Sequence, residues 1–381
     1  MVNFIGNTTA ITLTLSAIMV LFMEYSIWTP NYILTNKIVN HLTAIEAARV
    51  IVDNAGLPPG AIADLSRQAR IRATHYSTRI EGNRLTLEEA EEVITGRRRV
   101  FHGRERDVSE VRNYWEALTY IEDLVAQKRP IAENTIQRLA GIVMNGKRNG
   151  LLPYRTGQNV IRDSSSGDIV YMPPEAHDVP ILMSEMMKWI HEAILGKIPP
   201  VIIAGLAHYQ FVTIHPYYDG NGRMARLLAT LILQRCGYGL GGIFSLEEYH
   251  SKDIEAYYGA LDVGGHHNYY MGRADTDLTS WIEYFTDTLA QVFENAKKQA
   301  LDYSSIPTTK APESIQKLDH RAQVVLTLFN RQEFVTSNDV AAALGLSERM
   351  ARVLLSKWVS DGWLVVADAS RRSRKYSLTV G

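Results

Sequence analysis

The segment His215–Arg226 reads HPYYDGNGRMAR and decides the fold, because it joins two strongly apolar helical patterns. One helix is expected to end near Ile214, and the next to start near Arg223. Between them, Gly220 and Gly222 leave the backbone free to adopt positive φ angles. Successive N–H groups can then point inward and form an anion-binding nest at the start of the second helix.

Charged side chains around this loop indicate a polyphosphate site. Arg223 and Arg226 lie on one face of the second helix's first turn, where cations are disfavoured unless an anion binds there. Asp219 suits Mg²⁺, which favours one or two carboxylates together with substrate phosphates. His215, at the mouth of the loop, suits a general base. Each residue taken singly fits a plain solvated turn, but their joint order ahead of an apolar helix favours the phosphate site.

The same segment resembles the motif of the Fic family, H-P-F-x-D-G-N-G-R-x-x-R, with Tyr217 where phenylalanine is usual. The resemblance implies a mostly α-helical fold and transfer of AMP from ATP to a Ser, Thr or Tyr hydroxyl of a target protein. It implies that His215 deprotonates the hydroxyl and that Asp219 holds Mg²⁺. The residues that it assigns to nucleotide binding are Asp219, Gly220, Asn221, Gly222, Arg223, Arg226 and, as the adenine contact, Tyr257. A core tyrosine is an equally weighted interpretation of Tyr257.

A β-hairpin is predicted inside the helical core. Two β-prone runs, Asn159–Ile161 and Ile169–Tyr171, flank a stretch of serine and glycine. By resemblance, this hairpin is the family's flap, which pairs edge-on with the target as an added strand. The expected tip comprises Ser166, Gly167, Asp168 and Ile169.

A second motif precedes the core, at Ser77–Asn83, which reads STRIEGN. Glu81 is expected near the C-terminal end of a helix, where an anion is disfavoured and needs a cationic partner. The residues match the family's inhibitory pattern [S/T]-x-x-x-E-[G/N] through Ser77, Glu81 and Gly82. The resemblance implies that Glu81 pairs with Arg226 and blocks the seat of the γ-phosphate. Whether Glu81 also assists AMP removal stays open.

Composition and length complete the expected organisation. The 381 residues divide into a leader (1–23), an N-terminal helical region (24–105), the catalytic core (106–301), a linker (302–316) and a C-terminal domain (317–381). The uncharged stretch from Val2 to Met23 is read as an upstream translation artefact, a membrane anchor or a buried helix. No membrane contact is expected unless that stretch is an anchor. The single cysteine, Cys236, excludes a disulfide framework and favours a cytoplasmic location.

The C-terminal domain is predicted to be a winged helix-turn-helix. Its expected elements are Gln323–Arg331, Ser337–Leu344, Ser347–Asp361, Trp363–Ala367 and Lys375–Thr379. With a net charge of −1 the chain has no global basic field, so DNA contact would rest on a local patch. The candidate residues are Arg371, Arg372, Arg374 and Lys375. The competing interpretation is contact with a second copy of the chain or with a protein target. An ATP-sensing, DNA-binding regulator is therefore the alternative function, although a pure sensor would not need His215.

Overall fold

A computed structural model of the chain describes residues 28–57, 59–97, 100–146, 148, 150–162, 166–305, 320–329, 332–370 and 374–378. The leader and most of the expected linker lie outside this described part. Among the described residues, no helix combines the length and apolarity that crossing a membrane requires.

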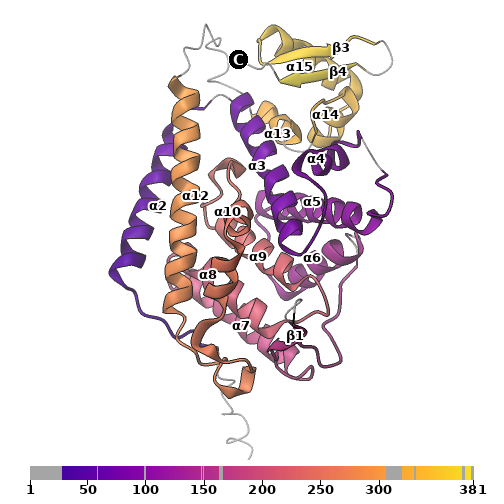
Figure 1. The fold of residues 1–381 in the computed structure, drawn as a ribbon. Coiled ribbons are helices and arrows are strands. Elements are labelled where there is room, and N and C mark those ends of the chain that lie inside the picture. Colours follow the sequence, from indigo (N-terminus) through magenta and orange to yellow (C-terminus); the bar gives the residue numbers. More distant parts are fainter. Residues whose placement is uncertain are drawn as a thin grey trace, which may run out of the picture.

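The N-terminal region supplies three helices: α2 (Asn36–Asn54), α3 (Pro59–Ile80) and α4 (Leu87–Thr95). α2 lies along the long helix α12 (Thr279–Ser305), as Figure 1 shows. α4 begins at a capping box, in which Thr86 and Glu89 bond each other's backbone N–H, and its C-cap is Gly96 with φ +72°. α3 runs from the top of the molecule in Figure 1 down to the middle, so its C-terminal end reaches the core.

The core is built around two helices that are buried almost throughout, α8 (Pro200–Ile214) and α9 (Asn221–Arg235). Around them pack α5 (Glu105–Ala126), α6 (Glu133–Asn145), α7 (Val179–Leu195) and α12. α8 and α9 pack against each other, and the loop between them holds the start of the His215–Arg226 motif. Because burial fixes both helices, it holds that loop in one place.

The predicted hairpin is present but shorter than expected. β1 (Ile161–Arg162) pairs antiparallel with β2 (Ile169–Tyr171), with Ile161 opposite Tyr171 and Arg162 opposite Ile169. Met172, just after β2, exchanges backbone hydrogen bonds with His267 and Tyr269. The base of the hairpin is therefore tied to the loop that precedes α12.

Several short helices connect α9 to α12 and were not predicted. They are η1 (Leu240–Gly242), α10 (Leu246–Lys252), α11 (Ile254–Leu261), η2 (Val263–Gly265) and η3 (Tyr269–Met271). α12 also continues to Ser305, so the expected linker start at 302 is still helical. The short helices between α9 and α12 have too few residues to show a periodic apolar pattern. Their N-caps, such as Ser245 and Asp253, are single residues and do not mark a helix without such a pattern.

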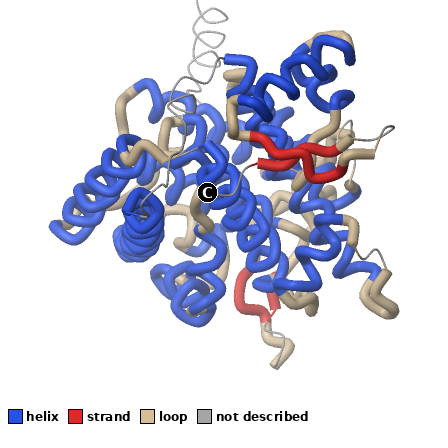
Figure 2. Tube along the Cα trace, turned by 90° about the horizontal axis from the view of Figure 1, so that it is seen from above, coloured by secondary structure: helices blue, strands red, loops and turns tan. Residues whose placement is uncertain are grey.

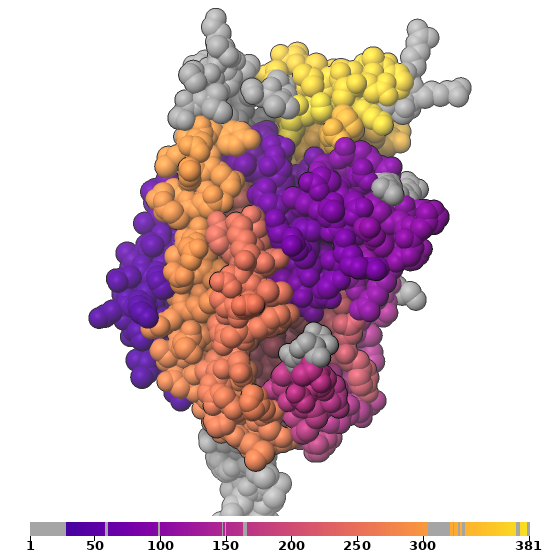
Figure 3. Space-filling model, viewed as in Figure 1, coloured from indigo at the N-terminus to yellow at the C-terminus, as the bar shows by residue number. Residues whose placement is uncertain are grey.

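The C-terminal unit consists of α13 (His320–Phe329), α14 (Ser337–Leu344), α15 (Glu348–Ser360), β3 (Leu364–Asp368) and β4 (Lys375–Leu378). β3 and β4 form an antiparallel pair, and Gly345 (φ +62°) makes the corner between α14 and α15. This unit has its own apolar core, which also includes Ala63 of α3. Figure 2 shows its hairpin well apart from the β1–β2 hairpin, and in Figure 3 the unit caps the end of the molecule where α3 begins.

Candidate active site

His215 lies at the C-terminal end of α8, in a left-handed conformation (φ 53°, ψ 59°) that turns the chain sharply into the loop. Its Nδ1 is 3.2 Å from the carbonyl oxygen of Val212. When Nδ1 donates that bond, Nε2 is left as a proton acceptor. Burial lowers the pKa of His215 to about 4, although the bond to Val212 opposes the shift. The imidazole is therefore neutral near pH 7, as a general base must be.

Arg155 holds the backbone around His215, and the sequence analysis did not single it out. The Arg155 side chain is buried; its Nε donates to the carbonyl oxygen of His215 at 2.9 Å, and its Nη1 donates to that of Gly157 at 3.1 Å. Its Nη2 donates to Pro174. One guanidinium thus ties the histidine to both ends of the segment that carries the hairpin. No sequence pattern marks such a residue, since its partners are backbone carbonyls distant along the chain.

The loop after His215 is fixed by a glycine and an asparagine. Gly220 has φ +78°, and a Cβ placed there would lie 2.6 Å from the Met144 Sδ. The Asn221 side chain accepts from the N–H of Tyr217 at 3.0 Å and donates to its carbonyl at 2.7 Å. Both bonds of the Asn221 side chain are therefore made within the loop, so this side chain holds the turn into α9. Tyr217 is buried.

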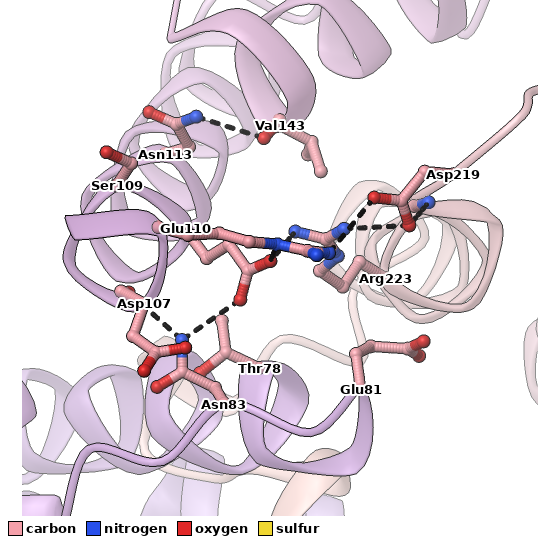
Figure 4. A network of polar contacts seen from close by, with 12 residues as sticks. Thr78, Glu81, Asn83, Asp107, Ser109, Glu110, Asn113, Val143, Asp219 and Arg223 are labelled. Atoms are coloured by element: carbon pink, nitrogen blue, oxygen red, sulfur yellow. Dashed lines mark hydrogen bonds and ion pairs between the residues drawn. The ribbon is translucent and has the colours of Figure 1, made fainter. Parts of the chain in front are cut away.

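Arg223 and Asp219 face each other at the start of α9. The Arg223 Nη2 is 3.2 Å from the Asp219 Oδ1, which also accepts from the Gly220 N–H. The Arg223 side chain is 3 % exposed, whereas that of Asp219 is 49 % exposed. Figure 4 shows Glu110 of α5 on the other side of the Arg223 guanidinium, 3.7 Å away. Asp219 thus offers a carboxylate to solvent while a buried cation lies behind it.

Arg226 and Glu81 form the ion pair that the sequence analysis expected. The Arg226 Nη2 donates to the Glu81 Oε1 at 2.8 Å; the Arg226 side chain is 1 % exposed and that of Glu81 is 27 % exposed. Ser77 completes the set, because its hydroxyl and carbonyl oxygens accept from Arg226 at 2.9 Å each. A Cβ at Gly222 would lie 2.3 Å from the Glu81 Oε1, so the carboxylate sits directly on the loop. Gly222 has no positive φ, and the close approach is what requires glycine there.

Tyr257 does not fit an adenine contact in this structure. It is 1 % exposed, its ring stacks on His250, and its hydroxyl lies 3.0 Å from the His208 Nε2 and 3.5 Å from Arg226. Tyr257 is therefore a core residue that packs beside Arg226, in line with the interpretation of Tyr257 as a core tyrosine. Tyr258, its neighbour, is 49 % exposed, and its hydroxyl lies 3.5 Å from the carbonyl oxygen of Ile80.

The remaining expected residues lie apart from this cluster. All four residues of the expected hairpin tip are exposed: Ser166, Gly167, Asp168 and Ile169. In the C-terminal unit, Arg374 and Lys375 are exposed, whereas Arg371 and Arg372 lie outside the described residues. The structure thus brings His215, the loop, both arginines and Glu81 together, whereas Arg374 and Lys375 lie in the C-terminal unit, which packs on α3.

Comparison with known proteins identifies a family domain. The Fic/DOC family model matches residues 130–233. Protein adenylyltransferase Fic of Drosophila willistoni is 28 % identical over 52 % of this chain and 38 % of its own length. The counterpart in Drosophila erecta is 31 % identical over 45 % of this chain and 34 % of its own length. The chain thus spans little more than a third of these curated relatives.

Solved structures extend the likeness along the chain. A Fic family protein from Desulfovibrio desulfuricans G20 is 27 % identical, with a TM-score of 0.59, covering 93 % of this chain and 99 % of its own. A Fic domain-containing signalling protein from Bacteroides thetaiotaomicron VPI-5482, 24 % identical with a TM-score of 0.60, supports the fold over 69 % of this chain. The chain therefore has the helical fold of Fic proteins and carries a Fic/DOC family domain at residues 130–233.

Proposed function

We propose that this chain is a protein adenylyltransferase that transfers AMP from ATP to a hydroxyl of a target protein and is inhibited by Glu81. The observation that carries the proposal is the loop after His215, with its neutral histidine and two buried arginines around one helix N-terminus. An anion-binding loop alone fits any phosphate ligand. A histidine held as a base at its mouth favours transfer to a hydroxyl over simple binding.

In the proposed reaction, His215 takes the proton of the target hydroxyl through Nε2. The hydroxyl oxygen forms a bond to the α-phosphorus of ATP, and the bond from that phosphorus to its leaving oxygen breaks, releasing pyrophosphate. Arg223 and Arg226, both nearly unexposed, would bind the outer phosphates. Because buried cations are weakly screened, they stabilise the charge that develops on the leaving group.

Asp219 is the residue that would hold Mg²⁺. The described residues contain no group of three or more His, Cys, Asp or Glu side chains suited to a metal ion. A site that depends on one half-exposed carboxylate fits Mg²⁺, which typically takes one or two protein carboxylates and completes its shell with phosphates and water. The bound ion would neutralise phosphate charge.

Glu81 is proposed to keep the site in an unproductive state. Its carboxylate occupies the guanidinium that the γ-phosphate would need, and it lies against Gly222 of the loop. A triphosphate that enters the site would therefore find the Arg226 guanidinium already paired, and the negative Glu81 carboxylate would repel its γ-phosphate. We further propose Tyr258, whose ring is exposed beside this turn, as the aromatic contact for the adenine base.

Target recognition is proposed to use the hairpin. Ile169 and Val170 of β2 are 42 % and 39 % exposed, which suits an extended target segment that adds to the hairpin as a strand. The test is incubation of the Glu81→Gly protein with a lysate and ATP labelled at either the α- or the γ-phosphate. The reference is lysate incubated with the Glu81→Gly, His215→Ala double variant, which accounts for label that the lysate's own kinases transfer. Protein-bound α-label above this reference supports AMP transfer, and an increase in γ-label alone refutes it.

A second proposal concerns the C-terminal unit, which we assign as a winged helix that contacts DNA. It is supported by the tight corner at Gly345 and by exposed basic residues on α15 and its hairpin: Arg349, Arg352, Lys357, Arg374 and Lys375. Met350 and Val353 are also exposed on α15, which a protein-contact surface would use instead. Titration with duplex DNA at several salt concentrations separates the two, because phosphate contacts weaken steeply with salt. No binding at low salt rejects the DNA role.

A further inference from the structure

Glu110 of α5 is a buried carboxylate beside the proposed phosphate site, with three partners from three parts of the chain. Its Oε2 accepts from the Asn83 Nδ2 at 3.0 Å. Its Oε1 accepts from the Arg106 Nε at 2.9 Å and lies 3.7 Å from the Arg223 Nη1. Figure 4 shows Glu110 between Asn83 and Arg223. The position of Glu110 needs an explanation, because a carboxylate beside Arg223 would be expected to compete with the phosphate for the charge of that arginine.

Asn83 connects this carboxylate to the inhibitory turn. It follows Glu81 by two residues and is buried; its Nδ2 also donates to the carbonyl oxygen of Asp107, and its Oδ1 accepts from the Leu85 N–H. The turn is thus anchored on α5 at the place where Glu110 projects. One short segment therefore reaches Arg226 through Glu81 and Arg223 through Asn83 and Glu110.

Burial indicates that Glu110 fixes Arg223. The Arg223 side chain is 3 % exposed and that of Glu110 is 11 % exposed, whereas Asp219, the other anion on Arg223, is 49 % exposed. A buried guanidinium is costly without a nearby counter-charge. The Arg223 Nε is buried and has no hydrogen-bond partner among the described residues, so the charge of this guanidinium depends on its two carboxylate neighbours. Glu110 therefore balances the charge of Arg223 from the buried side, opposite the half-exposed Asp219.

We propose that Glu110 is a positioning residue that holds Arg223 for the nucleotide and links it to the turn that carries Glu81. This inference rests on the proposed function and deepens it, since it assigns the control of both arginines to one turn. A movement of the turn that releases Glu81 from Arg226 would then also shift Asn83 and, through Asn83, the Glu110 carboxylate beside Arg223. The contrary interpretation is that Glu110 competes with phosphate, as Glu81 does.

The test compares Glu110→Gln with Glu116→Gln, both in the Glu81→Gly background. Glu116 lies on the same helix, where it pairs with Arg148. Binding of ATP with Mg²⁺ is measured by calorimetry, and kcat and KM are measured from α-label transfer. Glu110→Gln should weaken ATP binding and raise KM by about tenfold, with a smaller change in kcat. A tenfold change corresponds to the lower end of the free energies known for hydrogen bonds to charged groups. Glu116→Gln should leave both quantities unchanged.

Asn83→Ala supplies the second arm. It should shift KM in the same direction, and the double variant with Glu110→Gln should shift KM by less than the two single effects combined, because both act along one link. If Glu110→Gln does not melt cooperatively, Asn83→Ala tests the link alone. Unchanged KM, tighter ATP binding or fully additive effects would overturn the inference. If no variant transfers label, the proposed function fails, while calorimetry still decides the role of Glu110.

Discussion

Replacing Glu81 with glycine tests the inhibitory contact directly. The change removes the carboxylate that lies 2.8 Å from Arg226 and against Gly222, and leaves the two Ser77 bonds to hold the arginine in place. Hydrogen bonds to charged groups contribute about 1.5–3 kcal/mol. Since the Glu81 side chain is 27 % exposed, solvent screening places this contact toward the lower value.

That range predicts a ten- to hundredfold rise in activity, because each ~1.4 kcal/mol is worth a factor of about ten. The rise should be largest for self-modification, since the hairpin is available to the protein's own hydroxyls. The assay is the initial rate of label transfer from α-labelled ATP, followed on a gel and by intact mass. Glu81→Gln should give a smaller rise, because an amide keeps the size but not the charge.

Thermal melting supplies an independent readout. Without Glu81, Arg226 is a buried cation whose anionic partner is missing, so ATP should raise the melting temperature of Glu81→Gly more than that of the parent. Glu192→Gln, at an exposed position of α7, is the matched control and should change neither activity nor the ATP response. A Glu81→Gly protein no more active than its parent on any target tested would refute the inhibitory role and leave Glu81 as a helix cap or hydrolysis residue.

Three further predictions follow from the same site. Because burial lowers the pKa of His215 to about 4, kcat/KM should start to fall on the acid side only below the ordinary histidine pKa of about 6.5. As the pH falls, His215 takes up its proton at a higher pH in the unfolded chain than in the folded one. The free energy of unfolding, measured by denaturant titration, should therefore decrease as the pH drops from about 6.5 to 4. Asp219→Ala, or excess chelator, should abolish label transfer, and full turnover in chelator would contradict the metal role. Gly220→Ala should cost about 1–3 kcal/mol in chemical unfolding, since it forces a side chain to φ +78° and toward Met144; an unchanged midpoint would show that the loop relaxes freely.

The sequence predicted the parts of the structure that depend on local pattern. α14 has the bounds that the sequence predicts, and β2 coincides with the β-prone run Ile169–Tyr171. The pairing of Glu81 with Arg226 was anticipated only because the family resemblance supplied the partner, across 145 residues of chain.

The features that sequence analysis missed depend on contacts between distant segments. Arg155 bonds backbone carbonyls, which have no sequence signature, and Glu110 is one of several acidic residues on α5. Tyr257 and Tyr258 are adjacent, and only the tertiary packing of the short helix α11 decides which ring is buried. Periodicity resolves such choices in long helices, and α11 has just eight residues.

The most direct test of the central claim is intact-mass analysis of Glu81→Gly beside Glu81→Gly, His215→Ala, each incubated with ATP and Mg²⁺. The proposed function predicts that the single variant gains one or more AMP groups. It predicts that the double variant gains none while binding ATP with similar affinity, since His215 takes a proton and the arginines hold the phosphates. AMP addition at the same rate in both proteins would contradict the assignment of His215 as the general base and, with it, the proposed mechanism.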